Sequence, residues 1–206
     1  MPSPNKLVYI NCPFDREYKP FFEAIVFTIN ACGYLPQCAL ESPKSVDRLA
    51  KMIDLIDLCS FSIHDLSRTE LDSNMLPRFN MAFELGMAYG RKYRKGRKSG
   101  PELLVMDRDL HRFKLCLSDF KGCDVVSHSG NPLEIVALVR NWLSAYEKLP
   151  LNGPVHMKDW FTRFQCDLPD MCGRAGLNRD ELVFKDLVYC SGYWLDTYVP
   201  LRALTF

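Results

Sequence analysis

The chain has 206 residues, of which 48% are hydrophobic and 25% charged, and its formal net charge is +1. A chain of this length can bury a substantial core, and its near-neutral charge excludes a bulk preference for nucleic acid or for an anionic membrane. The first residues, MPSPNKLVYIN, lack a signal-peptide pattern and no run of about 18 apolar residues occurs, so we expect a cytoplasmic protein without a membrane partner.

Strand and helix patterns alternate through the first 148 residues. Residues 6–11 form a short apolar run typical of a strand, and residues 20–33 follow with helical spacing and a terminal glycine. Further strands are expected at 34–40, 60–66, 102–107 and 123–128, and further helices at 46–59, at 77–92, opened by Pro77, and at 131–148. Five strands with helical crossovers predict an α/β fold with a doubly wound, flavodoxin-like parallel sheet in the order 2-1-3-4-5.

Residues 149–206 have a different character and predict a helical C-terminal extension to an α/β domain at 1–148. A helix is expected at 157–168, a turn-bearing connection at 167–177, and a second helix from Asn178, where Glu181 completes a capping box. Aromatic residues give this segment a large apolar surface at positions 160, 161, 164, 184, 189, 193, 194 and 198. We expect that surface to pack on the sheet domain, to form a homo-oligomer or to bind a partner such as an effector protein.

Cysteines and histidines do not form a metal-binding pattern. The nine cysteines are an odd number without CxxC spacing, and the four histidines do not cluster with them, which favours reduced structural thiols over a zinc site. The chain also lacks GxGxxG after its first strand, the P-loop pattern and GxSxG, which argues against a hydride-transferring Rossmann site, a P-loop kinase and the common hydrolase elbow. We therefore expect no metal and no bound cofactor, so a dinucleotide would be a substrate.

The expected topology places a ligand beyond the carboxyl ends of the first and third strands, where the winding direction reverses. The segments there are 9–15 and 65–68, and the helix that carries Glu84 starts from the second of them. Candidate substrate-binding residues in these segments are Asn11, Pro13, Phe14, Asp65, Ser67 and Arg68. Arg16, Arg68 and Arg78 lie in or next to these segments, and an arginine there can fork onto a pyrophosphate or form a surface ion pair instead.

Glu84 is the one charged residue within 81–89, which is otherwise almost all apolar. Helical spacing, with glycines that permit close approach to the sheet, predicts a core stripe of Phe79, Ala82, Phe83, Gly86, Met87 and Gly90. A carboxylate beside such a stripe costs several kcal/mol unless it is hydrogen-bonded, or else its pKa rises. Two interpretations remain: a partly exposed glutamate on the helix margin, or a sheltered carboxylate with a function.

Several segments resemble a known superfamily. VYINCPFD at 8–15 and FELGMAYG at 83–90, together with SIHDLSR, PRFNMAFELG and CLSDFKGCD, are similar to the nucleoside 2-deoxyribosyltransferases and to their relatives, the TIR (Toll/interleukin-1 receptor) NAD-cleaving domains of bacterial defence systems. The resemblance covers residues 6–145. It implies that Glu84 is the carboxylate acting at the anomeric carbon and that Tyr9 is the hydroxyl that orients it. It also implies that Asp65 contacts the ribose or the base.

The sequence departs from the deoxyribosyltransferases at Arg78, where those enzymes have an aspartate that helps to protonate the leaving base. NAD needs less help, because its nicotinamide leaves as a neutral molecule from a cationic ring. A negative charge beneath ribose C1′ stabilises the cationic sugar of the transition state, or forms a covalent glycosyl-enzyme. Asn80, one helical turn before Glu84, is either a contact to a ribose hydroxyl or a surface amide.

The run RKYRKGRK at 91–98 contains six cations. It lies at the end of a helix, where positive charge favours the macrodipole, and it precedes the Gly100-Pro101 turn, so a solvated turn is favoured over a nucleic-acid contact.

Taken with the resemblance, these patterns predict an NAD nucleosidase, releasing ADP-ribose or its cyclic form, in an antiphage or stress response. We expect a homo-oligomer, because TIR-like sites are often completed across subunits. Two alternatives remain: a non-catalytic nucleotide-sensing or assembly module of the same fold, and a nucleoside 2-deoxyribosyltransferase.

Overall fold

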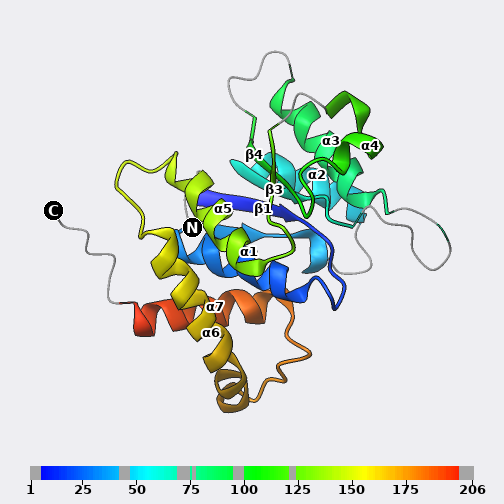
Figure 1. Cartoon of the computed structure of the whole chain (residues 1–206). Helices are drawn as coiled ribbons and strands as arrows, with labels where there is room; N and C mark the ends of the chain where they lie inside the picture. The colour runs from blue at the N-terminus through cyan, green and yellow to red at the C-terminus, as the bar shows by residue number, and fades with distance from the viewer. Residues whose placement is uncertain are drawn as a thin grey trace. The chain divides into compact units, whose positions relative to one another are not determined.

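The computed structural model of the chain describes residues 6–41, 47–68, 75, 78–94, 100–120 and 124–199. Its sheet consists of strands β1 (Leu7–Asn11), β2 (Leu35–Gln37), β3 (Phe61–Asp65), β4 (Glu102–Asp107) and β5 (Val125–Ser127). All neighbouring strands are parallel and lie in the order β2-β1-β3-β4-β5 (Figure 1). The predicted α/β fold with a flavodoxin-like order is therefore confirmed, and the winding direction reverses between β1 and β3.

The crossovers between strands contain the expected helices. The helices are α1 (Lys19–Ala31), α2 (Arg48–Leu58), α3 (Asn80–Lys92), α4 (Phe113–Cys116), α5 (Pro132–Ser144), α6 (Pro154–Ala175) and α7 (Phe184–Tyr198), with short 3-10 turns η2 (Ala39–Glu41) and η3 (Ser118–Phe120). Asp47 caps α2 by accepting hydrogen bonds from the N–H groups of Leu49 and Ala50. Pro77, which was expected to open the Glu84 helix, lies outside the described residues.

The contacts divide the chain into two compact units, each built from two segments of the chain. The first unit comprises Met1–Tyr18 and Leu35–Asn131, and the second comprises Lys19–Tyr34 and Pro132–Phe206. These units are groups of residues in mutual contact and do not test where one domain ends in the sequence. The predicted domain division at residue 148 therefore stays a prediction.

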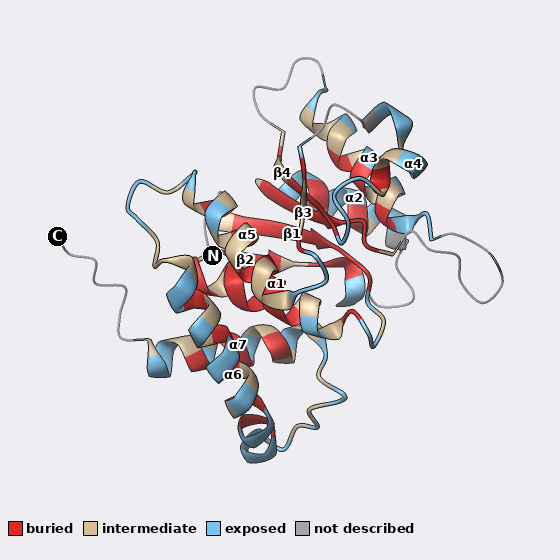
Figure 2. Cartoon of the chain, in the orientation of Figure 1, coloured by how far each residue is buried: buried red, intermediate tan, exposed pale blue. Residues whose placement is uncertain are grey.

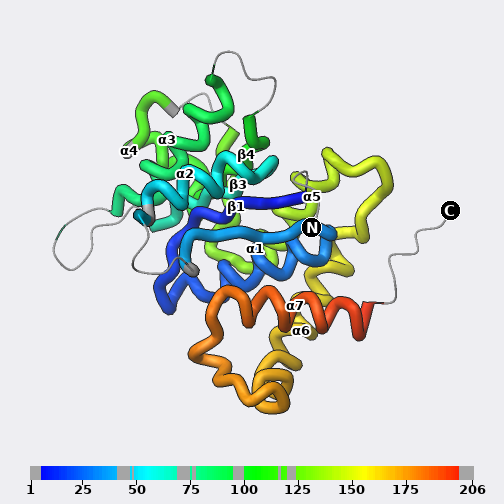
Figure 3. The backbone as a smooth tube through the Cα atoms, turned by 180° about the vertical axis from the view of Figure 1, so that it is seen from behind, coloured from blue at the N-terminus to red at the C-terminus, as the bar shows by residue number. Residues whose placement is uncertain are grey.

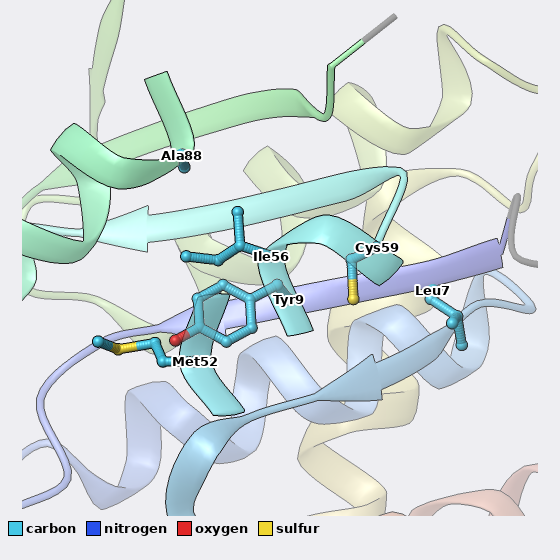
Figure 4. Packing of buried hydrophobic residues seen from close by; sticks show 6 residues of the cluster. All are labelled: Leu7, Tyr9, Met52, Ile56, Cys59 and Ala88. Carbon is cyan, nitrogen blue, oxygen red and sulfur yellow. The ribbon is translucent and has the colours of Figure 1, made fainter. Parts of the chain in front are cut away.

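In the first unit, α2 and α3 pack on the sheet. All residues of β1 and β3 are buried (Figure 2), as is typical of central strands in a parallel sheet. The core on this face contains Leu7, Tyr9, Met52, Ile56, Cys59 and Ala88. Figure 4 shows the Tyr9 ring lying beside Met52 and Ile56 of α2. The central strand therefore presents a tyrosine, held by α2, toward the helix that carries Glu84.

The second unit is a group of four helices, in which α1 packs against α5, α6 and α7 (Figure 3). Its core is aromatic: the ring of Phe27 lies 5.5 Å from Phe161, 5.0 Å from Phe164 and 5.8 Å from Trp194, measured between centroids. The predicted apolar surface of the C-terminal helices is thus partly covered by α1. Tyr189, Tyr193 and Tyr198 remain exposed.

Two predictions for the C-terminal segment are wrong. The expected connection at 167–177 is instead part of α6, which continues past Pro169 to Ala175. Buried Leu168, Met171 and Cys172 hold this half of the helix, and their packing outweighs the hydrogen bond that the proline removes. Asn178 does not cap a helix, because its side chain closes a turn onto the N–H of Asp180 and α7 begins only at Phe184.

Among the described helices, none combines the length and the apolar composition needed to span a membrane.

Candidate functional site

The face that α3 buries differs from the predicted core stripe. Its buried residues are Met81, Leu85 and Ala88. Phe79 and Phe83 are instead 70% and 56% exposed, and a side chain built on Gly86 or Gly90 would meet nothing within 4 Å. The predicted stripe and the close approach of the glycines are therefore wrong. Because the helix is apolar on almost every side, its periodicity does not select one face, and contacts with the sheet make the choice.

This register places Glu84 beside the buried face, where it is half-buried. Tyr9, fully buried in β1, donates its hydroxyl hydrogen to Glu84 Oε2 at 2.7 Å. Burial, and next the negative charge of Glu84, raise the pKa of Tyr9 far above its ordinary value. The phenol therefore stays protonated and donates to the carboxylate without neutralising it.

A second contact ties the first turn of α3 to β1. The buried Asn11 side chain donates from Nδ2 to the carbonyl of Met81 at 2.9 Å and lies 2.8 Å from His64 Nδ1. Burial lowers the pKa of His64 to about 3, so the ring is neutral and its Nδ1 accepts from Asn11. The Nε2 hydrogen then points to Ser62 Oγ at 2.6 Å. Asn11, predicted to bind substrate, is thus engaged in positioning the helix that carries Glu84.

Asp65, the last residue of β3, is the centre of a buried polar network. Its Oδ2 accepts from the Tyr18 hydroxyl at 2.6 Å and lies 3.2 Å from His128 Nε2, and its Oδ1 accepts from the Ser67 N–H at 2.8 Å. Ser67 Oγ lies 2.8 Å from the same His128 nitrogen. A serine-hydrolase triad needs the carboxylate on the opposite imidazole nitrogen, so this geometry does not support one.

The network continues at the end of β4. Buried Asp107 pairs with Arg112, whose Nη2 lies 3.3 Å from Asp107 Oδ1, and the same guanidinium donates to the Ser67 carbonyl. Burial raises the pKa of Asp107, and the nearby positive charge of Arg112 opposes that rise. The carboxyl ends of β3 and β4 are therefore joined by charged hydrogen bonds.

Asp15, just beyond β1, brings together two of the three arginines that were predicted to bind phosphate, Arg68 and Arg78, and the third, Arg16, is exposed. Arg68 Nη2 donates to Asp15 Oδ1 at 2.9 Å and to Glu17 Oε2 at 2.5 Å, and Arg78 Nη1 donates to Asp15 Oδ2 at 3.1 Å. Burial disfavours ionisation of Asp15, but hydrogen bonds from Arg68 and from the Tyr18 N–H outweigh it and hold its pKa below the ordinary value. Both arginines thus carry carboxylate partners in this structure.

The segment after β1 also contains a buried thiol, Cys12. Burial raises the pKa of Cys12 well above its ordinary value, and the negative charges of Asp65, Glu84 and Asp15 raise it further. Because Asp15 bonds to Arg68 and Arg78, and Tyr9 bonds to Glu84, the segments after β1 and β3 and the start of α3 meet as the topology predicts.

The other predicted site residues vary in their accessibility. Pro13 and Ser67 are buried and Phe14 is 40% exposed. Asn80, the first residue of α3, is exposed. The sequence analysis did not assign Asp15, Tyr18, His64 or His128 to the site. Asp15 and Tyr18 lie in or next to the loop after β1, so the expected topology could have placed them at the site. His128 contacts Ser67, which is 61 residues away in the sequence, and no pattern near His128 predicts that contact.

The basic run at 91–98 is described only as far as Arg94. Within that part, Arg91 pairs with Asp57, and Lys92 Nζ lies 3.0 Å from Glu102 Oε2. These two cations therefore have structural partners in α2 and β4, and residues 95–98 lie outside the described part of the chain.

The described cysteines, at 12, 32, 38, 59, 166, 172 and 190, are free thiols. In the part of the chain that the structure describes, no three His, Cys, Asp or Glu side chains group as metal ligands. Known proteins add no further assignment, because no family model, no curated protein and no solved structure matches the chain.

Proposed function

We propose that the protein cleaves the N-glycosidic bond between nicotinamide and ribose in NAD, with Glu84 as the carboxylate that acts at ribose C1′. The observation that carries the proposal is the 2.7 Å hydrogen bond from buried Tyr9 to half-buried Glu84. Both residues belong to the strand and helix that flank the reversal in winding, where sheets of this order bind ligands.

The proposed reaction needs a negative charge held in a fixed orientation. As the bond from C1′ to the nicotinamide nitrogen breaks, its electron pair leaves with neutral nicotinamide and the sugar gains cationic character. A carboxylate oriented beforehand stabilises that charge without reorganisation. Water, or an internal hydroxyl in the cyclising variant, then bonds to C1′ and loses a proton. The neutral Tyr9 donor suits this role, since a cationic donor would weaken the negative electrostatic potential of the carboxylate at C1′.

The arrangement of the neighbouring groups fits this role for Glu84. Asn11 fixes the first turn of α3 through the Met81 carbonyl, which sets the position of Glu84 one turn later. Asn80 is exposed on the same helix, so its amide is accessible to a ribose hydroxyl. The antiphage or stress role implied by the resemblance belongs to this proposal.

The decisive experiment incubates NAD with the purified protein over a range of protein concentrations and measures nicotinamide by chromatography. The range matters because assembly of subunits is part of the expectation. Glu84→Gln keeps the size of the side chain and removes its charge, so nicotinamide release should fall by about 10³-fold or more. Glu102→Gln is the matched control, since this half-exposed carboxylate lies at the amino end of β4 and should leave the rate unchanged.

Wild-type protein that binds NAD at every concentration but releases no nicotinamide would refute the enzymatic proposal and favour the nucleotide-sensing module. Exchange of free bases between deoxynucleosides, with NAD left intact, would favour the deoxyribosyltransferase instead.

A further inference from the structure

A cluster of two arginines and two carboxylates, here called the Asp15 cluster, consists of Asp15, Glu17, Arg68 and Arg78. Its arginines form an anion-binding arrangement in which the bound anions are the protein's own carboxylates. Arg68 comes from the end of β3 and Arg78 from the segment before α3, and both donate to opposite oxygens of Asp15. Two guanidinium groups that converge from separate segments form the geometry that proteins use to bind a phosphate by forked hydrogen bonds.

The charges of the cluster sum to zero, since two arginines face two carboxylates. The pyrophosphate of a dinucleotide also carries two negative charges and offers several acceptor oxygens. Such a ligand can replace both carboxylates without leaving the arginines unpaired. A nucleoside without phosphate offers no negative charge to exchange for them.

The cluster is accessible enough for such an exchange. The exposed fractions of the side chains are 30% for Arg68, 49% for Arg78, 23% for Asp15 and 82% for Glu17. The pairs that include the more exposed Arg78 and Glu17 contribute little to stability, because water screens them, so separating those pairs costs little. The two arginines can therefore change partners without disturbing the buried core.

We propose that Asp15 occupies a binding site for a pyrophosphate group and is displaced when a dinucleotide binds. Asp15 thereby sets the affinity for phosphate-bearing ligands and discriminates against free nucleosides. The inference rests on the proposed function for the identity of the ligand as NAD, but the exchange of anions is measured by binding and does not depend on catalysis.

The test compares binding of ADP-ribose, inorganic pyrophosphate and adenosine to wild-type protein and to Asp15→Asn by calorimetry. The asparagine oxygen can still accept from the Tyr18 N–H, which bonds Asp15 Oδ1 at 3.0 Å, so the turn should persist. We expect Asp15→Asn to bind ADP-ribose and pyrophosphate about tenfold more tightly, because the arginines lose a competing charge. Adenosine binding should not change. Adding Arg68→Gln should remove the gain.

Two further variants keep the test decisive. Glu17→Gln, at a mostly exposed position that cannot threaten folding, should tighten pyrophosphate binding by a smaller factor, about threefold. Glu102→Gln, which removes a carboxylate from an unrelated ion pair, should leave binding unchanged. Equal or weaker binding of both anions to folded Asp15→Asn, no gain in Glu17→Gln, or an equal gain for adenosine would overturn the inference.

The two proposals fail separately. An inactive wild type whose affinity for ADP-ribose rises in Asp15→Asn would refute NAD cleavage and support the anion exchange. An active wild type whose affinity and KM are the same in Asp15→Asn would refute the anion exchange alone.

Discussion

The two compact units bury polar groups in different ways. The buried polar residues of the first unit are Asn11, Ser62, His64, Asp65, Ser67, Asp107 and His128, most of them at or just beyond the carboxyl ends of strands. Those of the second are Glu23, Thr28 and Ser191. The first unit thus concentrates buried polarity where its topology expects a ligand, whereas the second is held mainly by aromatic packing.

One glutamate from each unit shows what this difference means. Glu23 is almost fully buried, and its two oxygens lie 2.7 Å from the two terminal nitrogens of Arg179, with Gln165 donating at 2.8 Å. This ion pair neutralises the carboxylate and fastens the loop before α7 to α1. Glu84 accepts a hydrogen bond from the uncharged phenol of Tyr9, which orients the carboxylate. The first arrangement fastens two segments together, and the second is the one on which the proposed function depends.

The largest expected effect on stability lies in the aromatic core of the second unit. Trp194 is buried, packs on Phe27 and Phe164 and donates to Asp167 at 2.8 Å. Trp194→Ala should lower the free energy of unfolding by about 3–5 kcal/mol in a urea titration. Tyr193→Ala, one residue away but 54% exposed, should cost less than about 1 kcal/mol. Equal losses would show that α7 is not held by this core.

A pH effect is expected from His64 in the first unit. Its pKa is about 3 in the folded protein, against about 6.5 in an unfolded chain, so below pH 6.5 the unfolded state binds a proton that the folded state does not. The free energy of unfolding should therefore fall by about 1.4 kcal/mol per pH unit as pH drops from 6.5 toward 3.

Urea titrations at pH 6.5 and 4.5 would measure this slope. His64→Gln, which retains a donor and an acceptor, should flatten the slope, and the exposed His156→Gln should leave it as in the wild type. An unchanged slope in His64→Gln would contradict a neutral, buried imidazole at this position.

Tyr9→Phe tests whether the phenol orients Glu84. Loss of a hydrogen bond to a carboxylate should lower the free energy of unfolding by about 1–2 kcal/mol. Nicotinamide release should fall by about 10- to 100-fold through kcat, with KM nearly unchanged, because the substrate is not what Tyr9 contacts. The acid limb of the activity profile should move to higher pH, a shift that mere loss of packing would not produce. Tyr93→Phe, exposed at the end of α3, is the control.

The smallest effect is expected at the start of α2. Asp47→Ala removes the cap that satisfies the N–H groups of Leu49 and Ala50 and should cost about 1 kcal/mol in the free energy of unfolding. Asp54→Ala, at an exposed position within the same helix, has no cap to lose and should cost less than about 0.5 kcal/mol. A larger loss at Asp54 would contradict the assigned start of the helix.

The sequence by itself determined the alternation of strands and helices, the parallel sheet and its order, because these follow from short-range periodicity and from rules of connection between neighbouring elements. It also predicted the edge of the sheet at which a ligand is expected, and the resemblance predicted the pairing of Tyr9 with Glu84, a contact that the structure contains. Their catalytic roles stay predictions.

Tertiary structure decided what local patterns leave ambiguous. Contacts with the sheet bury Met81, Leu85 and Ala88 of α3, a helix that is apolar on nearly all sides. Packing of the buried residues of α6 lets that helix continue past Pro169. Tertiary structure also paired Asp15 with Arg68 and Arg78, which lie 53 and 63 residues away and were predicted to bind phosphate. Hydrophobic periodicity depends on residues within a few positions of one another, so the sequence alone reveals it. Which face of a helix is buried, and which residue pairs with a charge, depend on segments that meet only after folding.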